Sequence, residues 1–328
     1  MKKLDKLLSD LQAKGLPVSL ASQMKPTLDC IPSGSVLLDH ATGIGGYPKG
    51  KIVELFGEPS SGKTLLLYAA EAFVTQQGQY VIHCDTEGNN THAELSQWRD
   101  VFGIDRERVI DIGPQCAEDV INALMDFTKT LGEDLGLIGI DSASALTSDK
   151  MLEKRAGEGY IPDNPRLVNA LCSKLNVVNR HAAVIIINHI MANIGSLSPR
   201  PIAKGGNGIK HYAVMRIEVN GKAIVDTTDP FGFAKQHELN MKVVKNKCAP
   251  PGGRALRVMF DFDRGSIDTA DEMITLAVEK GVIQHQGGGF YVMPNGEKHR
   301  GRQTLKDLIY SDKEWYNWFK AVTSGVEA

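Results

Sequence analysis

The eight residues from Gly57 to Thr64 read GEPSSGKT and match the phosphate-loop pattern GxxxxGK[ST]. The residues before them, KIVELF, predict a strand, and those after them, LLLYAAEAFVTQQG, predict a helix that ends at Gly78. In this setting backbone N–H groups and the helix N-terminus cradle phosphates, Lys63 reaches the β- and γ-phosphates, and the Thr64 hydroxyl is a ligand for Mg²⁺. We expect every loop residue to contact a nucleotide: Gly57, Glu58, Pro59, Ser60, Ser61, Gly62, Lys63 and Thr64.

Two carboxylates follow predicted strands further along the chain. Asp141 comes directly after LIGI (137–140), where an acid can hold Mg²⁺ through water. Alone it would be explained equally well as a turn or helix-capping aspartate, but the upstream phosphate loop favours the metal role. Glu87, in CDTEG after the predicted strand YVIHC (80–84), could orient the water that attacks a γ-phosphate. A plain surface-loop glutamate is the alternative, and periodicity does not decide between the two.

Strands and helices alternate around these residues. Helices are predicted at 120–131 and 168–180, and a buried strand, AVIII, at 183–187. The alternation predicts an α/β fold with a mainly parallel sheet, in which ligands bind at the carboxyl ends of the strands. After Ile217 the pattern changes to strands separated by turns, including one at 241–244. From Asp268 onward, a helix (272–280), a glycine-rich turn (287–289) and C-terminal helices predict a small separate lobe.

The first residues predict a short amphipathic helix. Over residues 3–13, Leu4, Leu7, Leu8 and Leu11 share one face, and GLP at 15–17 ends the helix. A single helix this short needs a partner surface. The sequence leaves open whether that surface belongs to its own core or to a neighbouring molecule.

The composition excludes several classes of protein. With 37 Lys and Arg against 39 Asp and Glu in 328 residues, the formal charge is −2, which excludes a uniformly basic nucleic-acid binder. Five cysteines without metal-binding spacing are typical of reduced thiols. The N-terminus carries charges every few residues, and the longest apolar run, 182–187, is too short to cross a membrane. We therefore expect a cytoplasmic protein of about two domains with no membrane partner.

Positive charge is concentrated in two stretches without acids. The first, 164–217, contains a predicted loop at 188–208, in which Gly205 and Gly206 could offer backbone N–H groups to a phosphate. Its basic residues are Arg166, Lys174, Arg180, Arg200, Lys204, Lys210 and Arg216. The second, 239–260, carries Lys242, Lys245, Lys247, Arg254 and Arg257. Such stretches in a net acidic chain favour an anionic polymer as ligand, and a merely solvated face is the alternative.

Together these motifs resemble the RecA family of homologous-recombination ATPases over nearly the whole chain. The similarity begins with IPSGSVLLDHATGIGGYPKGKIVELFG (31–57) and continues through the phosphate loop, CDTEG, IDSASALTS (140–148) and INH (187–189). It includes KGGNGIKHYA (204–213) and KVVKNK (242–247), an element that other phosphate-loop ATPases of this fold generally lack. The resemblance implies an N-terminal helix and linker for polymerisation (1–30), a RecA-type ATPase core with DNA-binding loops (31–265) and a small α/β C-terminal domain (266–328).

The resemblance also implies roles for single residues. Glu87 matches the catalytic glutamate, Asp141 the Mg²⁺-binding acid, and Trp98 the aromatic residue that stacks on adenine. Lys245 and Lys247 match lysines that reach the γ-phosphate of ATP bound to the neighbouring protomer. Residues that match the DNA-binding set are Ile161, Arg166, Ile194, Lys204, Gly205, Gly206, Asn207 and Lys242. Among these, the two isoleucines match the apolar side chains that wedge between base triplets.

Two residues depart from the bacterial pattern, His189 and also His211, which stands where an aromatic residue is usual. His189 stands where bacterial members carry a glutamine that senses the γ-phosphate and signals to a DNA-binding loop. Phage recombinases of the UvsX type also have Asn-His there, so we expect a phage-encoded protein that acts in the cytoplasm of its bacterial host. A histidine can still donate to a phosphate, and it would make the coupling sensitive to pH. A buried histidine with a structural hydrogen bond is the alternative.

The resemblance implies a DNA-dependent ATPase that uses ATP and Mg²⁺, forms helical filaments on single-stranded DNA and exchanges homologous strands in recombination and repair. Its expected partners are single-stranded DNA, homologous double-stranded DNA and further copies of itself, with single-strand-binding and loading proteins as additional candidates. Two alternatives are a catalytically silent paralogue that regulates other recombinases and a hexameric helicase or other RecA-fold motor. The intact Lys63, Glu87 and Asp141 argue against the first, and KVVKNK and the C-terminal lobe argue against the second.

Overall fold

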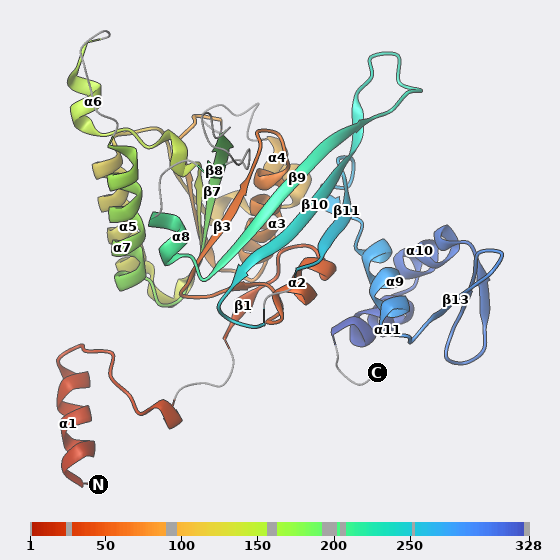
Figure 1. Ribbon diagram of the computed structural model, residues 1–328, viewed down its shortest axis with the longest axis horizontal. Coiled ribbons are helices and arrows are strands. Elements are labelled where there is room, and N and C mark those ends of the chain that lie inside the picture. Colours follow the sequence, from red (N-terminus) through yellow and green to blue (C-terminus); the bar gives the residue numbers. More distant parts are fainter. Residues whose placement is uncertain are drawn as a thin grey trace, which may run out of the picture.

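A single large sheet forms the centre of the protein. The computed structural model describes residues 2–23, 28–89, 97–155, 163–191, 202–203, 208–250 and 253–324. Its strand order is β12-β11-β10-β9-β3-β7-β6-β4-β5, with β8 paired to β7 beside this path (Figure 1). Neighbours from β9 to β5 are parallel, whereas β10, β11 and β12 are antiparallel. In sheet order from β12 the bounds are Ser266–Ile267, Ala255–Asp261, Ala234–Asn246, Met215–Val225, Ile52–Gly57, Ala183–Met191, Leu135–Asp141, Tyr80–Asp85 and Val109–Ile112, and β8 is Ile202–Ala203.

Helices cover both faces of the parallel part of this sheet (Figure 1). On one face α3 packs against an apolar cluster that includes Val53 and Ile185, and on the other α5, α7 and α8 pack against Ile140 and Ile186. The helices of the core are α2 (Val36–Thr42), α3 (Lys63–Gln76), α4 (Trp98–Phe102), α5 (Ala117–Leu131), α6 (Asp149–Glu153), α7 (Asn164–Val178) and α8 (Gly208–Tyr212), and a 3₁₀ turn, η5, spans Ala143–Ala145. The α/β architecture expected from the sequence is confirmed.

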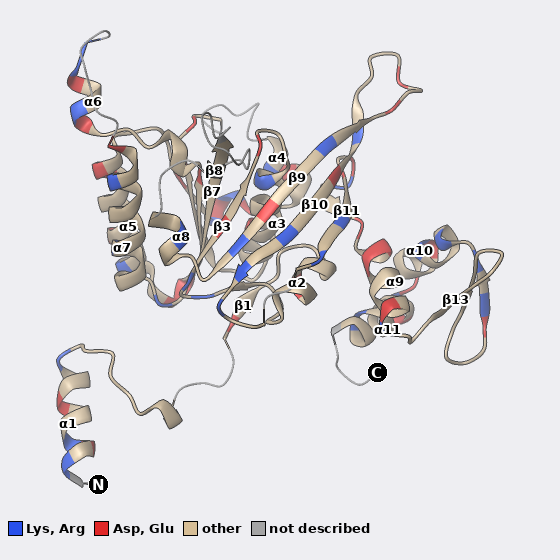
Figure 2. Ribbon diagram, viewed as in Figure 1, with Lys and Arg blue, Asp and Glu red and all other residues tan. Residues whose placement is uncertain are grey.

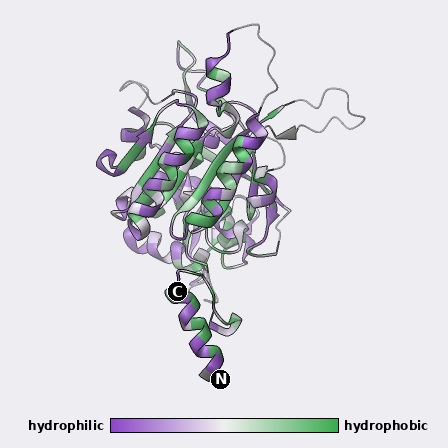
Figure 3. Ribbon diagram, turned by 90° about the vertical axis from the view of Figure 1, so that its left-hand side faces the viewer, coloured by the Kyte–Doolittle hydropathy of each residue, from purple (hydrophilic) through white to green (hydrophobic). Residues whose placement is uncertain are grey.

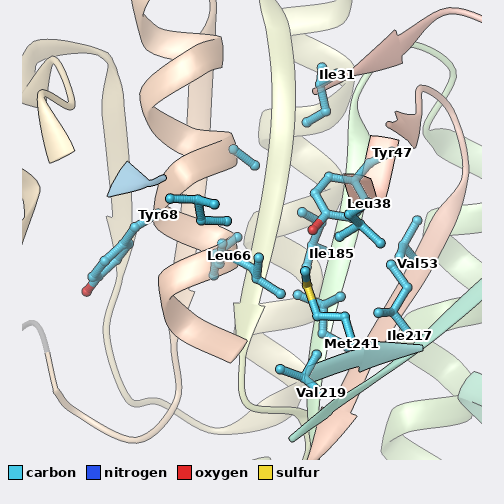
Figure 4. Packing of buried hydrophobic residues seen from close by; sticks show 14 of the residues in the cluster. Ile31, Leu38, Tyr47, Val53, Leu66, Tyr68, Ile185, Ile217, Val219 and Met241 are labelled. Atoms are coloured by element: carbon cyan, nitrogen blue, oxygen red, sulfur yellow. The ribbon is translucent and has the colours of Figure 1, made fainter. Parts of the chain in front are cut away.

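The strand AVIII shows why the central strands are apolar throughout. Ala183, Ile185 and Ile187 enter the cluster under α3, while Val184 and Ile186 enter the cluster under α5 and α7. All five side chains are fully buried, because a parallel strand covered on both faces has no solvent side. Figure 4 shows Ile185 among Val53, Leu66, Ile217 and Met241, residues contributed by neighbouring strands and by α3.

The prediction that residues 188–208 form a loop is wrong for residues 188–191, which belong to β7, for residues 202–203, which form β8, and for Gly208, which begins α8. β7 continues to Met191 because Asn188 and His189 still pair with the end of β3 and the last two residues pair with β8. The helix predicted from Val168 begins earlier, at Asn164. The strand expected at 241–244 is part of the longer β10.

A long hairpin formed by β9 and β10 extends away from the sheet (Figure 1), a feature that the sequence analysis did not predict. Both strands continue past the point where β3 ends: β9 runs on to Val225 and β10 begins at Ala234. At the tip, Phe231 and Phe233 are 83% and 68% exposed. Two aspartates of the hairpin connection, Asp226 and Asp229, accept hydrogen bonds from the connection itself.

The N-terminal helix α1 (Lys2–Ala13) lies away from the sheet (Figure 1). Its hydrophobic and hydrophilic residues alternate along the helix in Figure 3, as the sequence predicts. Leu4 and Leu7 are 49% and 54% exposed, so the core of the same chain does not cover this apolar face. Within the described part of the chain, no helix combines the length and the apolar character needed to cross a bilayer.

The C-terminal residues form a small lobe with its own core. Three helices, α9 (Thr269–Glu279), α10 (Arg302–Ser311) and α11 (Lys313–Ser324), pack with a small sheet, β13 (Gln284–Gln286), β14 (Phe290–Val292) and β15 (Lys298–Arg300). Leu305 and Phe319 are fully buried in this cluster. A further two-stranded sheet, β1 (Cys30–Ile31) with β2 (Tyr47–Pro48), flanks the core near α2.

A buried carboxyl group joins this lobe to the core. Glu272 of α9 accepts hydrogen bonds from the Ser35 hydroxyl (2.5 Å) and the Val36 backbone N–H (2.8 Å) at the start of α2. Burial raises the pKa of Glu272 to about 8, although these two hydrogen bonds act in the opposite direction. Burial also raises the pKa of nearby Asp39, to about 7.

We predict that Glu272→Gln reduces the pH dependence of stability. A carboxyl whose pKa is raised on folding binds more protons in the folded state, so the free energy of unfolding falls as pH rises from about 4.5 to about 8. Glutamine does not titrate, so the Glu272→Gln variant should lose this contribution to the slope of the unfolding free energy against pH. Denaturant titrations at several pH values measure this, with Glu279→Gln on the exposed side of the same helix as control. An unchanged slope in Glu272→Gln would refute the assignment.

Candidate nucleotide site and nucleic-acid interface

The phosphate loop lies between β3 and α3, as the motif predicts. Gly62 has a φ of +94°, a left-handed conformation that favours glycine, and a Cβ there would lie 2.2 Å from Leu239 Cδ2. A Cβ on Gly57 would lie 1.9 Å from the carbonyl oxygen of Val219. The two glycines therefore let the neighbouring strands β9 and β10 approach the loop closely.

Lys63 is the first residue of α3, and its side chain turns back into the loop. Its Nζ donates to the carbonyl oxygens of Gly57 (3.2 Å) and Glu58 (2.6 Å) and to the Ser61 hydroxyl (3.3 Å). Burial lowers the pKa of Lys63, while the charges of Asp141 and Glu87 raise it in part. An ammonium group in this position is suited to bind the oxygens of a phosphate group.

Thr64 and Asp141 form a pair of oxygen ligands beside the loop. The Thr64 hydroxyl donates to Asp141 Oδ2 at 2.7 Å. Asp141 is buried, and this burial raises its pKa, with a smaller contribution from the charge of Glu87. A hydroxyl beside a carboxylate fits Mg²⁺, a hard cation that prefers oxygen, and a cation there would offset the cost of burying the negative charge.

Glu87, just after β4, is held by Ser142, which follows the neighbouring strand β6, and by His189 of β7, the next strand beyond β6. Its Oε1 accepts a hydrogen bond from the Ser142 hydroxyl (2.6 Å) and faces His189 Nε2 at 3.0 Å. Burial alone would raise the pKa of Glu87, but the hydrogen bonds from Ser142 and His189 lower it below its ordinary value. The carboxylate is thus ionised at neutral pH and only partly exposed, as a general base for water should be.

Sequence reasoning missed the residues that hold Glu87 in place. Thr86 Oγ1 donates to the Ser142 carbonyl (2.6 Å) and accepts from the Ser142 N–H (2.9 Å), so the residues after β4 and β6 are joined twice. The peptide bond between Asp141 and Ser142 is cis. Hydroxyl residues directly after both strands were the available signal, but their roles become visible only once β4 and β6 are known to be adjacent.

Trp98 begins α4, and its side chain is 37% exposed. Its ring lies 5.7 Å from that of Phe262, between centroids. The contact leaves part of the indole accessible, and stacking on adenine stays a prediction.

A β-bulge determines which way the lysines of β10 point. Val243 and Lys245 pair with successive residues of β9, so Val244 is an extra residue in β10. In a regular strand Lys245 would face the same side as the buried Val243. With the bulge, Lys245 lies opposite Arg216, on the same face as exposed Lys242.

The lysines therefore form a positive row on the face of β10 that α3 does not cover. Lys247, two residues beyond Lys245, is also exposed. Figure 2 shows Lys and Arg residues along this part of β9, β10 and β11. Burial lowers the pKa of Lys245, and the charges of Lys247 and Arg216 lower it further. The charge of Glu54, which pairs with Arg216, offsets part of this repulsion, and a bound anion would relieve the remainder.

Arg166, the remaining DNA candidate within the described residues, is exposed in the first turn of α7. It lines a hollow between α5 and α7 together with Lys150 and Lys174, but also with two acids, Glu118 and Asp163. The surface there is thus less uniformly positive than the acid-free stretch suggests. Six other candidates, Ile161, Ile194, Lys204, Gly205, Gly206 and Asn207, lie outside the described residues.

A phosphate loop with carboxylates at the carboxyl ends of neighbouring strands in a mainly parallel sheet is typical of a phosphate-loop nucleoside triphosphatase. Residues 2–265 match the family described as "RecA N-terminal domain". Proteins named "Protein RecA" from Francisella tularensis subsp. novicida (strain U112), subsp. holarctica (strain LVS) and subsp. tularensis (strain SCHU S4) are each 33% identical to this chain over 317 residues, which cover 94% of it and 84% of the relative.

The chain belongs to the RecA family. It is a RecA-like recombinase and a DNA-dependent ATPase, as the resemblance in its motifs implied. ATP binding, DNA binding and filament formation follow from the same homology.

We predict that two substitutions separate ATP binding from hydrolysis. Lys63→Ala removes the charged donor and should weaken ATP binding at least about tenfold. Glu87→Gln should keep ATP binding but lower hydrolysis by about a hundredfold or more, because the general base is lost. Nucleotide binding by fluorescence and phosphate release measure the two effects, with exposed Glu133→Gln as control. Hydrolysis at the unchanged rate in Glu87→Gln would mean that another group activates the water.

Proposed function

We propose that this protein polymerises on single-stranded DNA with ATP and Mg²⁺ bound at each protomer interface, and that it pairs the strand with homologous duplex DNA in recombination and repair. The observation that carries this proposal is the lysine row on β10, which faces away from the phosphate loop of its own chain. A neighbouring protomer would complete the site.

The sheet register separates these lysines from their own nucleotide site. Lys245 lies level with Arg216 of β9 and Glu54 of β3, three residues before Gly57. The backbone of Lys245 is therefore separated from Gly57 by about 10 Å along the strands and by two strand spacings, about 10 Å, across the sheet. A lysine side chain does not extend that far, and the row also lies on the face opposite α3. Any contact with a γ-phosphate therefore requires a second protomer.

In such an interface the residues of two chains would share the chemistry. Lys63 would bind the β- and γ-phosphates, Glu87 would accept a proton from the attacking water, and His189 would hold Glu87 and lie near the γ-phosphate. Thr64 and Asp141 would hold Mg²⁺, which neutralises phosphate charge when bound. Lys245 and Lys247 of the neighbour would stabilise the charge of the transition state, so that hydrolysis depends on assembly.

The exposed apolar face of α1 supports assembly through the N-terminus. Leu4 and Leu7 need a covering surface that the core of the same chain does not supply. We therefore assign residues 1–30 to polymerisation, 31–265 to the ATPase core with its DNA-binding loops, and 266–328 to the C-terminal domain. Arg166 on α7 would contact the DNA backbone together with the loop residues named above.

The setting of this activity is also part of the proposal. Asn-His at 188–189 supports a phage-encoded recombinase of the UvsX type, acting in the cytoplasm of a bacterial host. Single-strand-binding and loading proteins are the further partners that such an activity would use. The alternatives are a silent paralogue and a ring-forming motor, and electron microscopy with an ATP analogue and single-stranded DNA separates them. Open helical filaments support the proposal, closed rings the motor, and neither assembly the paralogue.

We predict that Arg166→Ala weakens binding to single-stranded DNA of every sequence, because a contact with phosphate carries no base information. The slope of the logarithm of the binding constant against the logarithm of the salt concentration should become less steep by about 0.7, the value for one phosphate contact. Fluorescence anisotropy at several salt concentrations measures it. Arg180→Ala, just beyond the other end of α7, is the control and should leave the slope unchanged. The same slope in both variants would remove Arg166 from the interface.

We predict that Lys245→Ala with Lys247→Ala leaves nucleotide binding by monomers nearly intact, but lowers DNA-stimulated hydrolysis and ATP-dependent assembly together. Each protomer would still hold ATP, while the charge from the neighbour would be missing. ATPase assays and light scattering measure these effects. Lys235→Ala, on the same strand and paired with Asp226, is the control.

A mixing experiment tests the sharing of the site directly. The double variant and Lys63→Ala each lack a different half of the interface, so a mixed interface can contain one complete site. Partial recovery of hydrolysis on mixing is expected. Mixed filaments that assemble normally and recover no hydrolysis would contradict action in trans.

A further inference from the structure

Asn164, the first residue of α7, connects this helix to the turn that follows the Mg²⁺-binding acid. Its Nδ2 donates to the carbonyl oxygens of Ala143 (3.1 Å), the first residue of η5, and Leu146 (3.0 Å), the residue directly after η5. The amide group thus uses both of its hydrogens on another segment of the chain rather than on the first turn of its own helix. Its bonds fix the position of α7 relative to η5.

The residue before this turn contacts the candidate catalytic carboxylate, Glu87. Ser142 immediately precedes Ala143, and its hydroxyl donates to Glu87 Oε1 (2.6 Å). Ser142 and Ala143 are both fully buried, so neither can move without displacing well-packed neighbours. A shift of the Ala143 carbonyl would therefore be transmitted to the hydrogen bond that orients Glu87.

We propose that Asn164 is a positioning residue that couples DNA contact on α7 to the geometry of Glu87. Arg166, two residues further along in the first turn of α7, is exposed and is the proposed DNA contact, so the inference rests on the proposed function in this respect. DNA bound at Arg166 pulls on the start of α7. The two hydrogen bonds of Asn164 carry that displacement to η5, and Ser142 carries it to Glu87.

The test compares Asn164→Ala with Asn176→Ala, an exposed asparagine on the same helix. Hydrolysis of ATP is measured with and without single-stranded DNA, and DNA affinity is measured with a non-hydrolysable ATP analogue. In Asn164→Ala the ratio of stimulated to unstimulated hydrolysis should fall about tenfold, a usual size for coupling between sites. DNA affinity should change by less than about twofold, and Asn176→Ala should match the unchanged protein. Asn164→Ser keeps one donor and should give an intermediate ratio.

Two outcomes would overturn this inference but leave the proposed function intact. One is an unchanged ratio of stimulated to unstimulated hydrolysis in Asn164→Ala, and the other is a fall in DNA affinity that parallels the fall in this ratio. The second would mean that Asn164 only supports the binding surface. If Asn164→Ala unfolds at the assay temperature, the ratio in Asn164→Ser decides by the same criteria. Unchanged protein whose hydrolysis does not respond to single-stranded DNA would instead overturn the proposed function, and the inference with it.

Discussion

The parallel register of the central strands brings the candidate catalytic groups together. Gly57 of β3 lies beside His189 of β7, and Asp85 of β4 lies beside Asp141 of β6, although these residues are far apart in the sequence. Because parallel strands end at a common edge, the phosphate loop, the acids and the histidine meet there. Apolar packing on both faces fixes the register, since a slip by one residue would reverse the face of every side chain in the strand.

Within this edge, the buried charges depend on one another. The charges of Asp141 and Glu87 favour the ammonium form of Lys63, which burial opposes. Ser142 and His189 in turn keep Glu87 ionised. A nucleotide with its cation would add charges of both signs to this balanced set. The site is therefore preorganised by its own polar contacts, and it needs little rearrangement to develop charge during hydrolysis.

The sequence predicted the features that short patterns determine. GEPSSGKT, the apolar strands and the acids that follow them depend on neighbouring residues, and the structure has them at the expected places. The roles of Thr86, Ser142 and Asn164 depend on contacts between distant segments, which no local pattern reveals. The continuation of β7 to Met191 depends in the same way on pairing with β3 and β8. The β9–β10 hairpin was missed because its connection, with aspartate, proline and glycine, resembles an ordinary turn.

The bulge at Val244 makes the length of this segment as important as its composition. If β10 paired with β9 regularly through every residue, without the bulge, Lys245 would turn toward the apolar side of β10, even though every lysine would still be present in the sequence. A relative that lacks the bulge would keep this lysine on the same face only if it also had one residue fewer between Val243 and Lys245. A comparison of basic residues by number alone would not detect the difference.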